Sequence, residues 1–156
     1  VTVMNTGEAL QTGSPTDLHE QPQAPFVGYF IGSPGMNVMK ATVQDGHLRA
    51  GEFELPVTPE QKAQLNTDDV KIGIRPEFVQ IDAESGDFEA EINAVYLTGS
   101  ARVLDLEGDK LNFKVRVDED RLFQAGDTVW VTFPHKWLMI YADGRAIERP
   151  MEATEA

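Results

Sequence analysis

Hydrophobic and polar side chains alternate with a period of two along most of the chain after residue 33. Successive side chains of a β-strand point to opposite faces of a sheet, so each such run has one apolar and one polar face. The clearest runs are 52–57, 70–75, 88–94, 111–118 and 128–133. The turn signals that separate the strands are Asp45-Gly46, Ser85-Gly86-Asp87, Glu107-Gly108-Asp109, Ala125-Gly126-Asp127 and Asp143-Gly144. Many short, half-buried strands with such turns predict a mainly β fold, an antiparallel sandwich or barrel.

One segment of this region breaks the alternation and predicts a short helix over 58–65. Thr58 is a suitable N-cap, because its hydroxyl accepts a hydrogen bond from a free amide of the first turn. Pro59 suits the first helical position, where its missing N–H would have no partner anyway. We expect Ala63 and Leu65 to pack against the sheet.

The first 32 residues have a different pattern. Residues 1–5 and 8–12 predict a β-hairpin. The chain opens without Met in the middle of a strand, which we interpret as a start inside a longer polypeptide or as a processed start. Ser14 and Pro15 predict a helix to about Gln21. A second short helix with an aromatic face is expected over 24–30. The breakers that follow, 31–35, predict a domain boundary.

We therefore divide the chain into residues 1–32, a β domain over 33–150, and a disordered tail over 151–156.

Composition excludes several classes of partner. The chain has 26 acidic and 13 basic residues, a formal charge of −13. Nucleic-acid binding draws its affinity from cationic side chains, so DNA and RNA are poor partners for this chain. Cysteine is absent, which excludes disulfides and thiolate metal sites. No apolar run approaches the roughly 20 residues of a membrane span.

Motifs for catalysis are missing from the sequence. There is no Gly-Lys pair and hence no phosphate-binding P-loop, and no G-x-S-x-G nucleophile elbow. His19, His47 and His135 are far apart and are expected to have surface or packing roles. We interpret loop 82–87 and Asp118-Glu119-Asp120 as solvated turns, the former a hairpin turn, rather than calcium sites. The sequence predicts no catalytic, cofactor-binding or metal-binding residue in this chain.

Three aromatic residues near the C-terminal end, Trp130, Trp137 and Tyr141, allow a stacking platform for single-stranded nucleic acid. Such platforms lie in cationic grooves, whereas this chain is strongly acidic. We therefore favour core packing or a protein contact for these side chains.

Two segments resemble a known family. The first runs from Val3-Met4-Asn5-Thr6-Gly7 to the group Phe30, Gly32, Ser33, Pro34, Met36 and Asn37. It resembles the end of the nucleotide-binding domain in ATPase subunits of ABC importers for sugars, polyols and glycerol phosphate. The second, Gly73-Ile74-Arg75-Pro76-Glu77, is similar to the hallmark of the regulatory domain that follows in the maltose-importer type. The resemblance covers nearly the whole chain and is weak after Leu97.

This resemblance implies an OB-like TOBE domain that pairs with its copy in a second ATPase subunit. It implies contacts with the nucleotide-binding domain and the membrane subunits, and in some members with a cytoplasmic regulatory protein. ATP and magnesium would be bound by the parent protein, upstream of Val1. The implied location is the cytoplasmic side of the bacterial inner membrane.

Several motif residues also have structural interpretations. Gly73 would allow close backbone approach, and Pro76 would end strand pairing. Arg75 and Glu77 are expected on one strand face, paired with each other or with a neighbouring subunit. One interpretation is that the linker helix packs onto the β domain or onto the absent domain through Phe26, Tyr29, Phe30 and Ile31. We favour the simpler interpretation that these four side chains are ordinary core residues.

The later family pattern Leu-Gly-x-Glu-Thr is replaced here by Leu97-Thr98-Gly99-Ser100-Ala101, without the glutamate. Two alternatives stay open at this point. One is a barrel that binds a small oxyanion of the molybdate type, for which Ser100 and Arg102 are suggestive. The other, disfavoured by charge, is a nucleic-acid OB domain.

Overall fold

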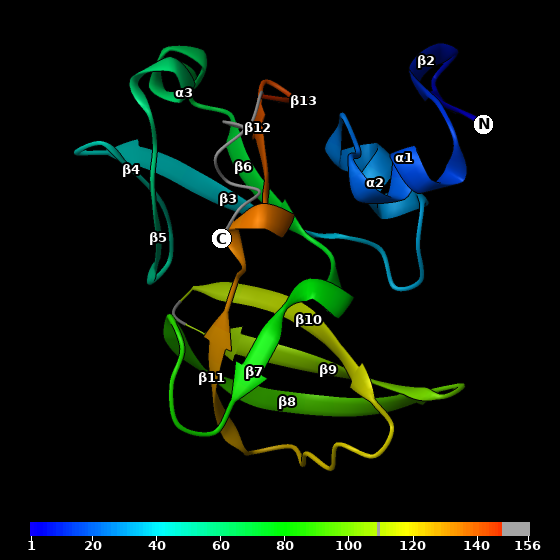
Figure 1. Ribbon diagram of the computed structural model, residues 1–156, viewed down its shortest axis with the longest axis vertical. Helices are drawn as coiled ribbons and strands as arrows, with labels where there is room; N and C mark the ends of the chain where they lie inside the picture. The colour runs from blue at the N-terminus through cyan, green and yellow to red at the C-terminus, as the bar shows by residue number, and fades with distance from the viewer. Residues whose placement is uncertain (109, 148–156) are drawn as a thin grey trace.

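The computed structural model describes residues 1–108 and 110–147 and is mostly antiparallel β-sheet. Figure 1 shows a five-stranded sheet below, a six-stranded sheet above it, and the N-terminal segment beside the upper sheet. The strand orders are β10-β9-β8-β11-β7 and β13-β12-β6-β3-β4-β5, and β1-β2 form a separate hairpin. The mainly β prediction is confirmed, with OB-like sheets as its form.

The helices and strands have the following bounds. The N-terminal segment holds β1 (Thr2–Asn5), β2 (Glu8–Thr12), α1 (Pro15–Glu20) and α2 (Pro25–Phe30). The middle of the chain holds β3 (Asn37–Gln44), β4 (His47–Ala50), β5 (Phe53–Pro56), α3 (Pro59–Gln64), β6 (Val70–Ile74), the 3₁₀ helix η1 (Pro76–Phe78) and β7 (Gln80–Asp82). The remainder holds β8 (Phe88–Thr98), β9 (Ala101–Gly108), β10 (Leu111–Asp118), β11 (Thr128–Thr132), η2 (His135–Trp137), β12 (Met139–Ala142) and β13 (Arg145–Ala146).

The five alternating runs of the sequence form β5, β6, β8, β10 and β11, as predicted. In β10 the alternation is complete, since its odd-numbered residues are buried and its even-numbered residues are exposed. The N-terminal hairpin, α1, α2 and α3 are also confirmed. The predicted tail over 151–156 lies outside the described residues.

One apolar core lies between the two larger sheets, and Phe133 is at its centre. The Phe133 ring centroid is 5.0 Å from that of Phe53, 5.3 Å from Phe88 and 5.4 Å from Phe113. Phe53 comes from the six-stranded sheet, whereas Phe88 and Phe113 come from the five-stranded sheet. Because aromatic pairs at these separations add to the energy of burial, this cluster holds the two sheets together.

Asp45 and Gly46 join β3 to β4 with φ angles of 53° and 73°. Two successive residues in the left-handed region make the tight turn whose twist matches that of the flanking strands. Asp143 and Gly144 make the corresponding turn between β12 and β13, with φ angles of 49° and 79°. These two turn predictions are confirmed.

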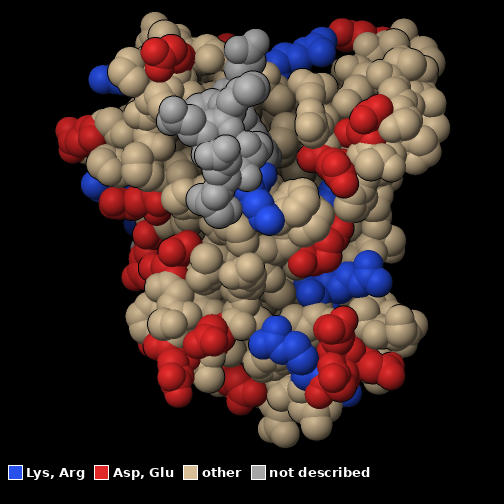
Figure 2. Space-filling model, in the orientation of Figure 1, with Lys and Arg blue, Asp and Glu red and all other residues tan. Residues whose placement is uncertain are grey.

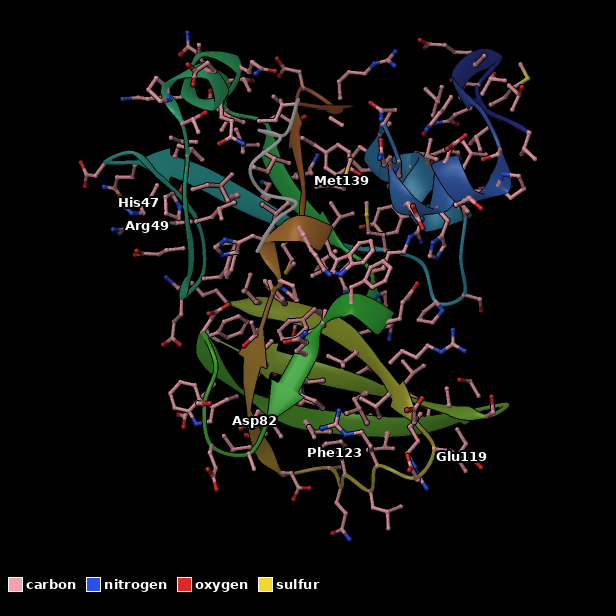
Figure 3. The ribbon with its side chains drawn as sticks, viewed as in Figure 1. His47, Arg49, Asp82, Glu119, Phe123 and Met139 are labelled. Carbon is pink, nitrogen blue, oxygen red and sulfur yellow. The ribbon has the colours of Figure 1, made fainter. Side chains whose placement is uncertain are left out.

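Loop 82–87 is not the hairpin turn that the sequence suggested. Its flanking strands β7 and β8 do not pair with each other, because β11 lies between them and pairs with both. The Oδ1 atom of Asp82, at the end of β7 (Figure 3), accepts hydrogen bonds from the amides of Glu84 and Ser85 at 2.8 and 3.0 Å. These bonds lower the pKa of the Asp82 carboxyl from its ordinary value of 3.8.

Helix α3 packs differently from the prediction. Thr58 and Gln61 form a reciprocal capping box, in which each side chain accepts a hydrogen bond from the backbone amide of the other. This contact draws Gln61 into a buried position, and Leu65 is buried as expected. Ala63 is exposed, so its predicted packing was wrong, because the short helix turns this residue outward.

The N-terminal segment has a small core of its own, made by Val3, Leu18, Ala24 and Val27. Ser14 and Asp17 form the capping box of α1, which lowers the pKa of the Asp17 carboxyl. The predicted core positions of three aromatic residues were wrong. Phe26, Tyr29 and Phe30 are 36%, 56% and 67% exposed, because α2 turns Val27 and Gly28 inward instead.

Acidic side chains are spread over the whole face that Figure 2 shows, with basic side chains between them. This face offers no continuous basic track of the kind that binds a phosphate backbone.

Candidate functional site

Arg75 joins the N-terminal segment to the β domain. Its side chain is 3% exposed and lies directly after β6. Its Nε donates a hydrogen bond to the carbonyl of His19 at 2.7 Å. Its Nη1 donates to the carbonyls of Ile31 at 2.6 Å and Gly28 at 3.3 Å. One guanidinium therefore binds three backbone oxygens that precede it by 44 to 56 positions.

These oxygens are at the C-terminal ends of two helices. His19 lies in the last turn of α1, Gly28 lies in the last turn of α2, and Ile31 is the C-cap of α2. The last carbonyls of a helix lack intrahelical donors and carry the negative end of the helix dipole. A cation is favourable at this position, and the planar fork of arginine can reach several acceptors at once. Arg75 thus caps two short helices from a distant strand.

Burial of this cation has a cost, which is visible in its pKa. Loss of solvation lowers the pKa of the Arg75 guanidinium from its ordinary value, and the carboxylate of Glu77 acts in the opposite direction. The Nη2 atom is buried and has no hydrogen-bond acceptor among the described residues. The three hydrogen bonds to carbonyl oxygens offset part of the cost of burying the guanidinium.

Glu77 contacts the same helix from another side. Its carboxylate oxygen lies 3.0 Å from Nε2 of His19, and both side chains are about one third exposed. The prediction that Arg75 and Glu77 share a strand face was wrong, because Pro76 starts η1 and ends the strand at Ile74. Arg75 and Glu77 instead hold the backbone and the side chain of His19.

Met36 fills the apolar part of the junction, between Gly28 of α2 and Gly73 of β6. A Cβ atom at Gly28 would lie 2.3 Å from Met36 Cε, and one at Gly73 would lie 2.8 Å from the same atom. Gly73 therefore makes room for side chains, those of Met36 and Tyr141, where close backbone approach was expected. The hydroxyl of Tyr141 donates to the carbonyl of Pro22 at 2.8 Å, which adds a further link between the two parts.

Asn37 links the two large sheets. Its Nδ2 donates to the carbonyl of Lys114 and its Oδ1 accepts from the amide of Lys114, both at 2.8 Å. Lys114 lies on β10, an edge strand of the five-stranded sheet, whereas Asn37 begins β3 of the six-stranded sheet. The side-chain amide thus pairs with β10 as a neighbouring strand would. This pairing covers part of the edge of β10, which would otherwise be free to pair with another strand.

The remaining motif residues support this junction or surround it. Gly32 has a φ of 113°, and a Cβ atom there would lie 2.6 Å from Nη1 of Arg75, so glycine is required for two reasons. Ile74 and Pro76 are buried on either side of Arg75. Ser33 and Pro34 form the linker through a cis peptide bond, and Phe30 lies outside the junction with an exposed ring.

Sequence reasoning missed five partners of these residues, namely His19, Pro22, Gly28, Lys114 and Tyr141. Four of them contribute backbone groups, which a pattern of side chains does not reveal. The buried tyrosine on β12 was the one available signal, since a buried phenol needs a hydrogen-bond partner.

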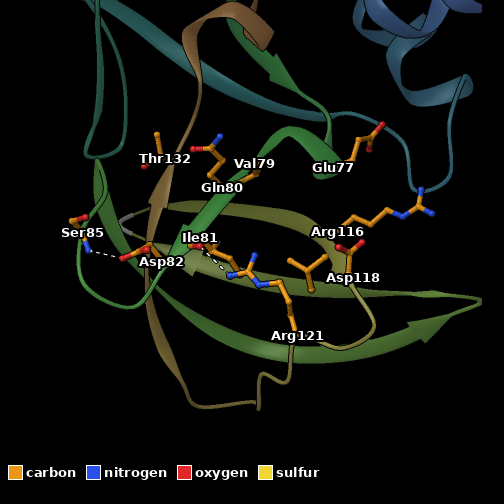
Figure 4. A pocket seen from close by; sticks show the side chains of 11 residues that line it. Glu77, Val79, Gln80, Ile81, Asp82, Ser85, Arg116, Asp118, Arg121 and Thr132 are labelled. Carbon is orange, nitrogen blue, oxygen red and sulfur yellow. Dashed lines mark hydrogen bonds between the residues drawn. The ribbon is translucent and has the colours of Figure 1, made fainter.

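An open cleft of about 600 Å³ lies between β7 and β10, the two edge strands of the five-stranded sheet (Figure 4). Arg116 and Arg121 line it together with Glu77, Asp82 and Asp118. Nη2 of Arg121 donates to the carbonyl of Ile81 at 3.2 Å and so bridges the two edges. Three carboxylates outweigh two guanidinium groups here, which disfavours a small oxyanion.

The other suggestive anion ligands are also unsuited to that role. Ser100 is exposed at the tip of the β8–β9 hairpin, and Arg102 donates from Nε to the carbonyl of Glu119 at 2.8 Å. Across the described ranges no three His, Cys, Asp or Glu side chains gather as a metal site would need.

The aromatic residues near the C-terminal end do not form one platform. Trp137 stacks on Phe78 with ring centroids 4.0 Å apart, whereas Tyr141 is buried against Met36. Trp130 is half-buried on β11. The predicted packing role is confirmed for Tyr141.

Fold and junction together define a class: an OB-like β domain fixed to the end of a preceding helical segment. Residues 32–79 match the MalK OB fold domain, and residues 72–140 match the TOBE domain. The two matched ranges overlap at 72–79, which contain Arg75 and η1.

Curated relatives extend the match to nearly the whole chain. The oligosaccharides import ATP-binding protein MsmX of Bacillus subtilis is 34% identical over 85% of this chain and 40% of its own length. The sn-glycerol-3-phosphate import ATP-binding protein UgpC of Pectobacterium atrosepticum is 33% identical over 86% of this chain and 38% of its own. The trehalose/maltose import ATP-binding protein MalK of Thermococcus litoralis is 33% identical over 94% and 44%.

The chain therefore belongs to the family of OB-fold and TOBE regulatory domains that end the ATP-binding subunits of sugar and glycerol-phosphate ABC importers. It spans about 40% of the length of these relatives. Among the described residues no helix is long and apolar enough to cross a membrane.

Proposed function

We propose that this chain is the regulatory and dimerisation part of the ATP-binding subunit of an ABC importer for a sugar, a polyol or glycerol phosphate. The relatives named above, import proteins for oligosaccharides, sn-glycerol 3-phosphate and trehalose/maltose, support this solute class. The observation that carries the proposal is the cap that Arg75 places on α1 and α2. It fixes the segment that resembles the end of a nucleotide-binding domain to the OB and TOBE part.

In this proposal the chain itself hydrolyses no ATP, and ATP and magnesium are bound by the preceding nucleotide-binding domain. That domain also covers the exposed aromatic face of α2, where Phe26 and Phe30 stack with centroids 5.9 Å apart. Exposed aromatic side chains that are already ordered by stacking form a suitable contact surface, since little entropy is lost when they are covered.

The proposed partners are a second copy of the chain, the membrane subunits of the importer and a cytoplasmic regulatory protein. The proposed location is the cytoplasmic side of the bacterial inner membrane. The acidic surface fits a domain that works beside the membrane without binding anionic lipid directly.

Sedimentation equilibrium of the isolated chain, combined with an ATPase assay, tests this proposal. We expect a reversible monomer–dimer equilibrium and no ATP hydrolysis. A chain that stays monomeric at the highest accessible concentration, or one that hydrolyses ATP alone, would contradict it.

A further inference from the structure

A groove of about 550 Å³ lies between the end of α2 and the five-stranded sheet. On one side it is lined by Tyr29 and by the linker that leads into β3. On the other side it is lined by Asn93, Asp105, Asn112 and Lys114. Its volume falls in the range of small-molecule sites. The groove is formed by the N-terminal segment and the β domain together.

The walls of this groove are held in place. A Cβ atom at Gly35 would lie 2.7 Å from the carbonyl oxygen of Tyr29, so the end of α2 rests directly on the linker. On the opposite wall, the two hydrogen bonds from Asn37 fix the backbone of Lys114. Nζ of Lys114 is held by Asp105 and lies 6.0 Å from the centroid of the Tyr96 ring. A site with fixed walls loses little entropy when it binds a ligand.

The polar side chains that line the groove are three asparagines and one ion pair. Asn37, Asn93 and Asn112 line it, but both amide atoms of Asn37 are bound to the backbone of Lys114, and Nδ2 of Asn93 donates to Glu107 at 3.0 Å. Asn112 is exposed, and its amide has no partner in the described part of the chain. Lys114 and Asp105 neutralise each other. The balanced charges of the groove differ from those of the chain as a whole, which has a formal charge of −13.

Tyr29 supplies an aromatic face to the same groove. Its ring is 56% exposed, although its backbone is fixed by contact with Gly35. The exposed Asn112 amide and a neutral ion pair, beside an aromatic ring that covers C–H groups, suit a ligand with many hydroxyls and no charge. An anion would lose its solvation here without gaining an unpaired cation.

We propose that this groove binds a neutral polyhydroxylated molecule, a sugar or a sugar alcohol. Asn112 and the Lys114–Asp105 pair bind hydroxyl groups, and Tyr29 stacks on the apolar face of the ligand. This site goes beyond the proposed function, because it gives the domain a small-molecule ligand of its own. A bound ligand contacts α2 and β10 at once, so it stabilises the junction that Arg75 also holds.

The test is an NMR titration of the chain with maltose, glucose, sorbitol and glycerol 3-phosphate, each up to about 50 mM, which covers weak, millimolar binding. The side-chain amide signals of Asn93 and Asn112 report directly on the groove. The variants are Asn112→Ala and Tyr29→Ala, both at exposed positions. Asn66→Ala is the matched control, since Asn66 is an exposed asparagine outside this groove.

We expect saturable shifts of the Asn112 amide with at least one neutral ligand. Each groove variant should weaken this binding about tenfold, the loss of one or two hydrogen bonds or of one stacked ring. Asn66→Ala should leave it unchanged. Backbone spectra of all variants establish that each is folded.

Three results would overturn the site: no saturable shift with any neutral ligand, binding unaffected by both groove variants, or binding only of glycerol 3-phosphate. The proposed regulatory function is tested separately by self-association, so failure of one proposal is distinguishable from failure of the other.

Discussion

The Nε atom of Arg75 lies 2.7 Å from the carbonyl oxygen of His19, a residue 56 positions earlier in the chain. The same guanidinium binds two carbonyls at the end of α2. Because these helices are only six residues long, their stability depends on tertiary contacts more than on helix propensity. Arg75 is therefore a central buried link between the N-terminal segment and the β domain, beside the hydrogen bond from Tyr141 to Pro22.

Replacement of this arginine should be strongly destabilising. Arg75→Ala removes a charged donor from three carbonyls, although that of Gly28 still accepts from the amide of Met36, and we expect the free energy of unfolding to fall by about 3 kcal/mol or more. Arg75→Lys retains the charge but lacks the planar fork, so an intermediate loss is expected. Urea denaturation measures both. Arg145→Ala is the control, because its 3.7 Å ion pair with Glu8 joins the same two parts on the exposed surface.

For that control we expect at most about 0.5 kcal/mol. Equal effects of Arg75→Ala and Arg145→Ala would contradict the role given to the buried guanidinium.

Asn37 offers a second test, because asparagine and aspartate have the same shape. Asn37→Asp keeps the acceptor for the amide of Lys114 but replaces the donor with an oxygen that faces the Lys114 carbonyl. We expect a loss of about 2 kcal/mol, at least as large as that of Asn37→Ala. Thermal and urea unfolding of both variants measure it. An Asn37→Asp variant as stable as the parent chain would show that the amide does not link the sheets.

Gly73 should be energetically coupled to Met36. A Cβ atom at Gly73 would approach the Sδ atom of Met36 to 2.9 Å and a ring carbon of Tyr141 to 3.0 Å. We expect Gly73→Ala to cost about 1–3 kcal/mol through overpacking, and Met36→Ala to relieve part of that cost. A double-mutant cycle measures the coupling.

Gly46→Ala serves as the control for that cycle. Its φ of 73° makes alanine unfavourable by about 1 kcal/mol, but nothing lies within 4 Å of the added atom. Its effect should therefore add to that of Met36→Ala. Simple additivity of Gly73→Ala with Met36→Ala would contradict the packing described here.

Acid should weaken the fold partly through Asp82. Its carboxylate accepts two backbone hydrogen bonds, which lower its pKa from 3.8. A carboxyl whose pKa is lower in the folded state stabilises the protein above its unfolded pKa, and this contribution is lost as the pH falls through the folded pKa. Asp82→Asn should therefore flatten the decline of stability below about pH 4. Urea unfolding across this range measures it, with Glu52→Gln as a control carboxylate.

The sequence was informative where one face of an element meets water. The strand β10 was predicted correctly because Leu111, Phe113, Val115 and Val117 alternate with polar residues. The strand β12 was missed, because Met139, Ile140 and Tyr141 are all buried and show no alternation. The pairing of β11 between β7 and β8 was also missed, since strand order leaves no trace in local periodicity.

The junction was predictable only in part. The resemblance pointed to Gly32, Met36, Asn37, Gly73 and Arg75, and the structure brings these residues to the N-terminal segment or to the facing sheet. What they contact could not be predicted, because the partners of Arg75 and Asn37 are backbone groups far away in sequence. Side-chain patterns carry no information about such groups.

Hydrogen–deuterium exchange of α1 and α2 tests the central claim, that Arg75 fixes the N-terminal segment to the β domain. Amides of residues 15–31 should exchange faster in Arg75→Ala than in the parent chain, while those of β8–β10 stay protected and Arg145→Ala shows no change. Unchanged protection of residues 15–31 in a folded Arg75→Ala variant would contradict the claim.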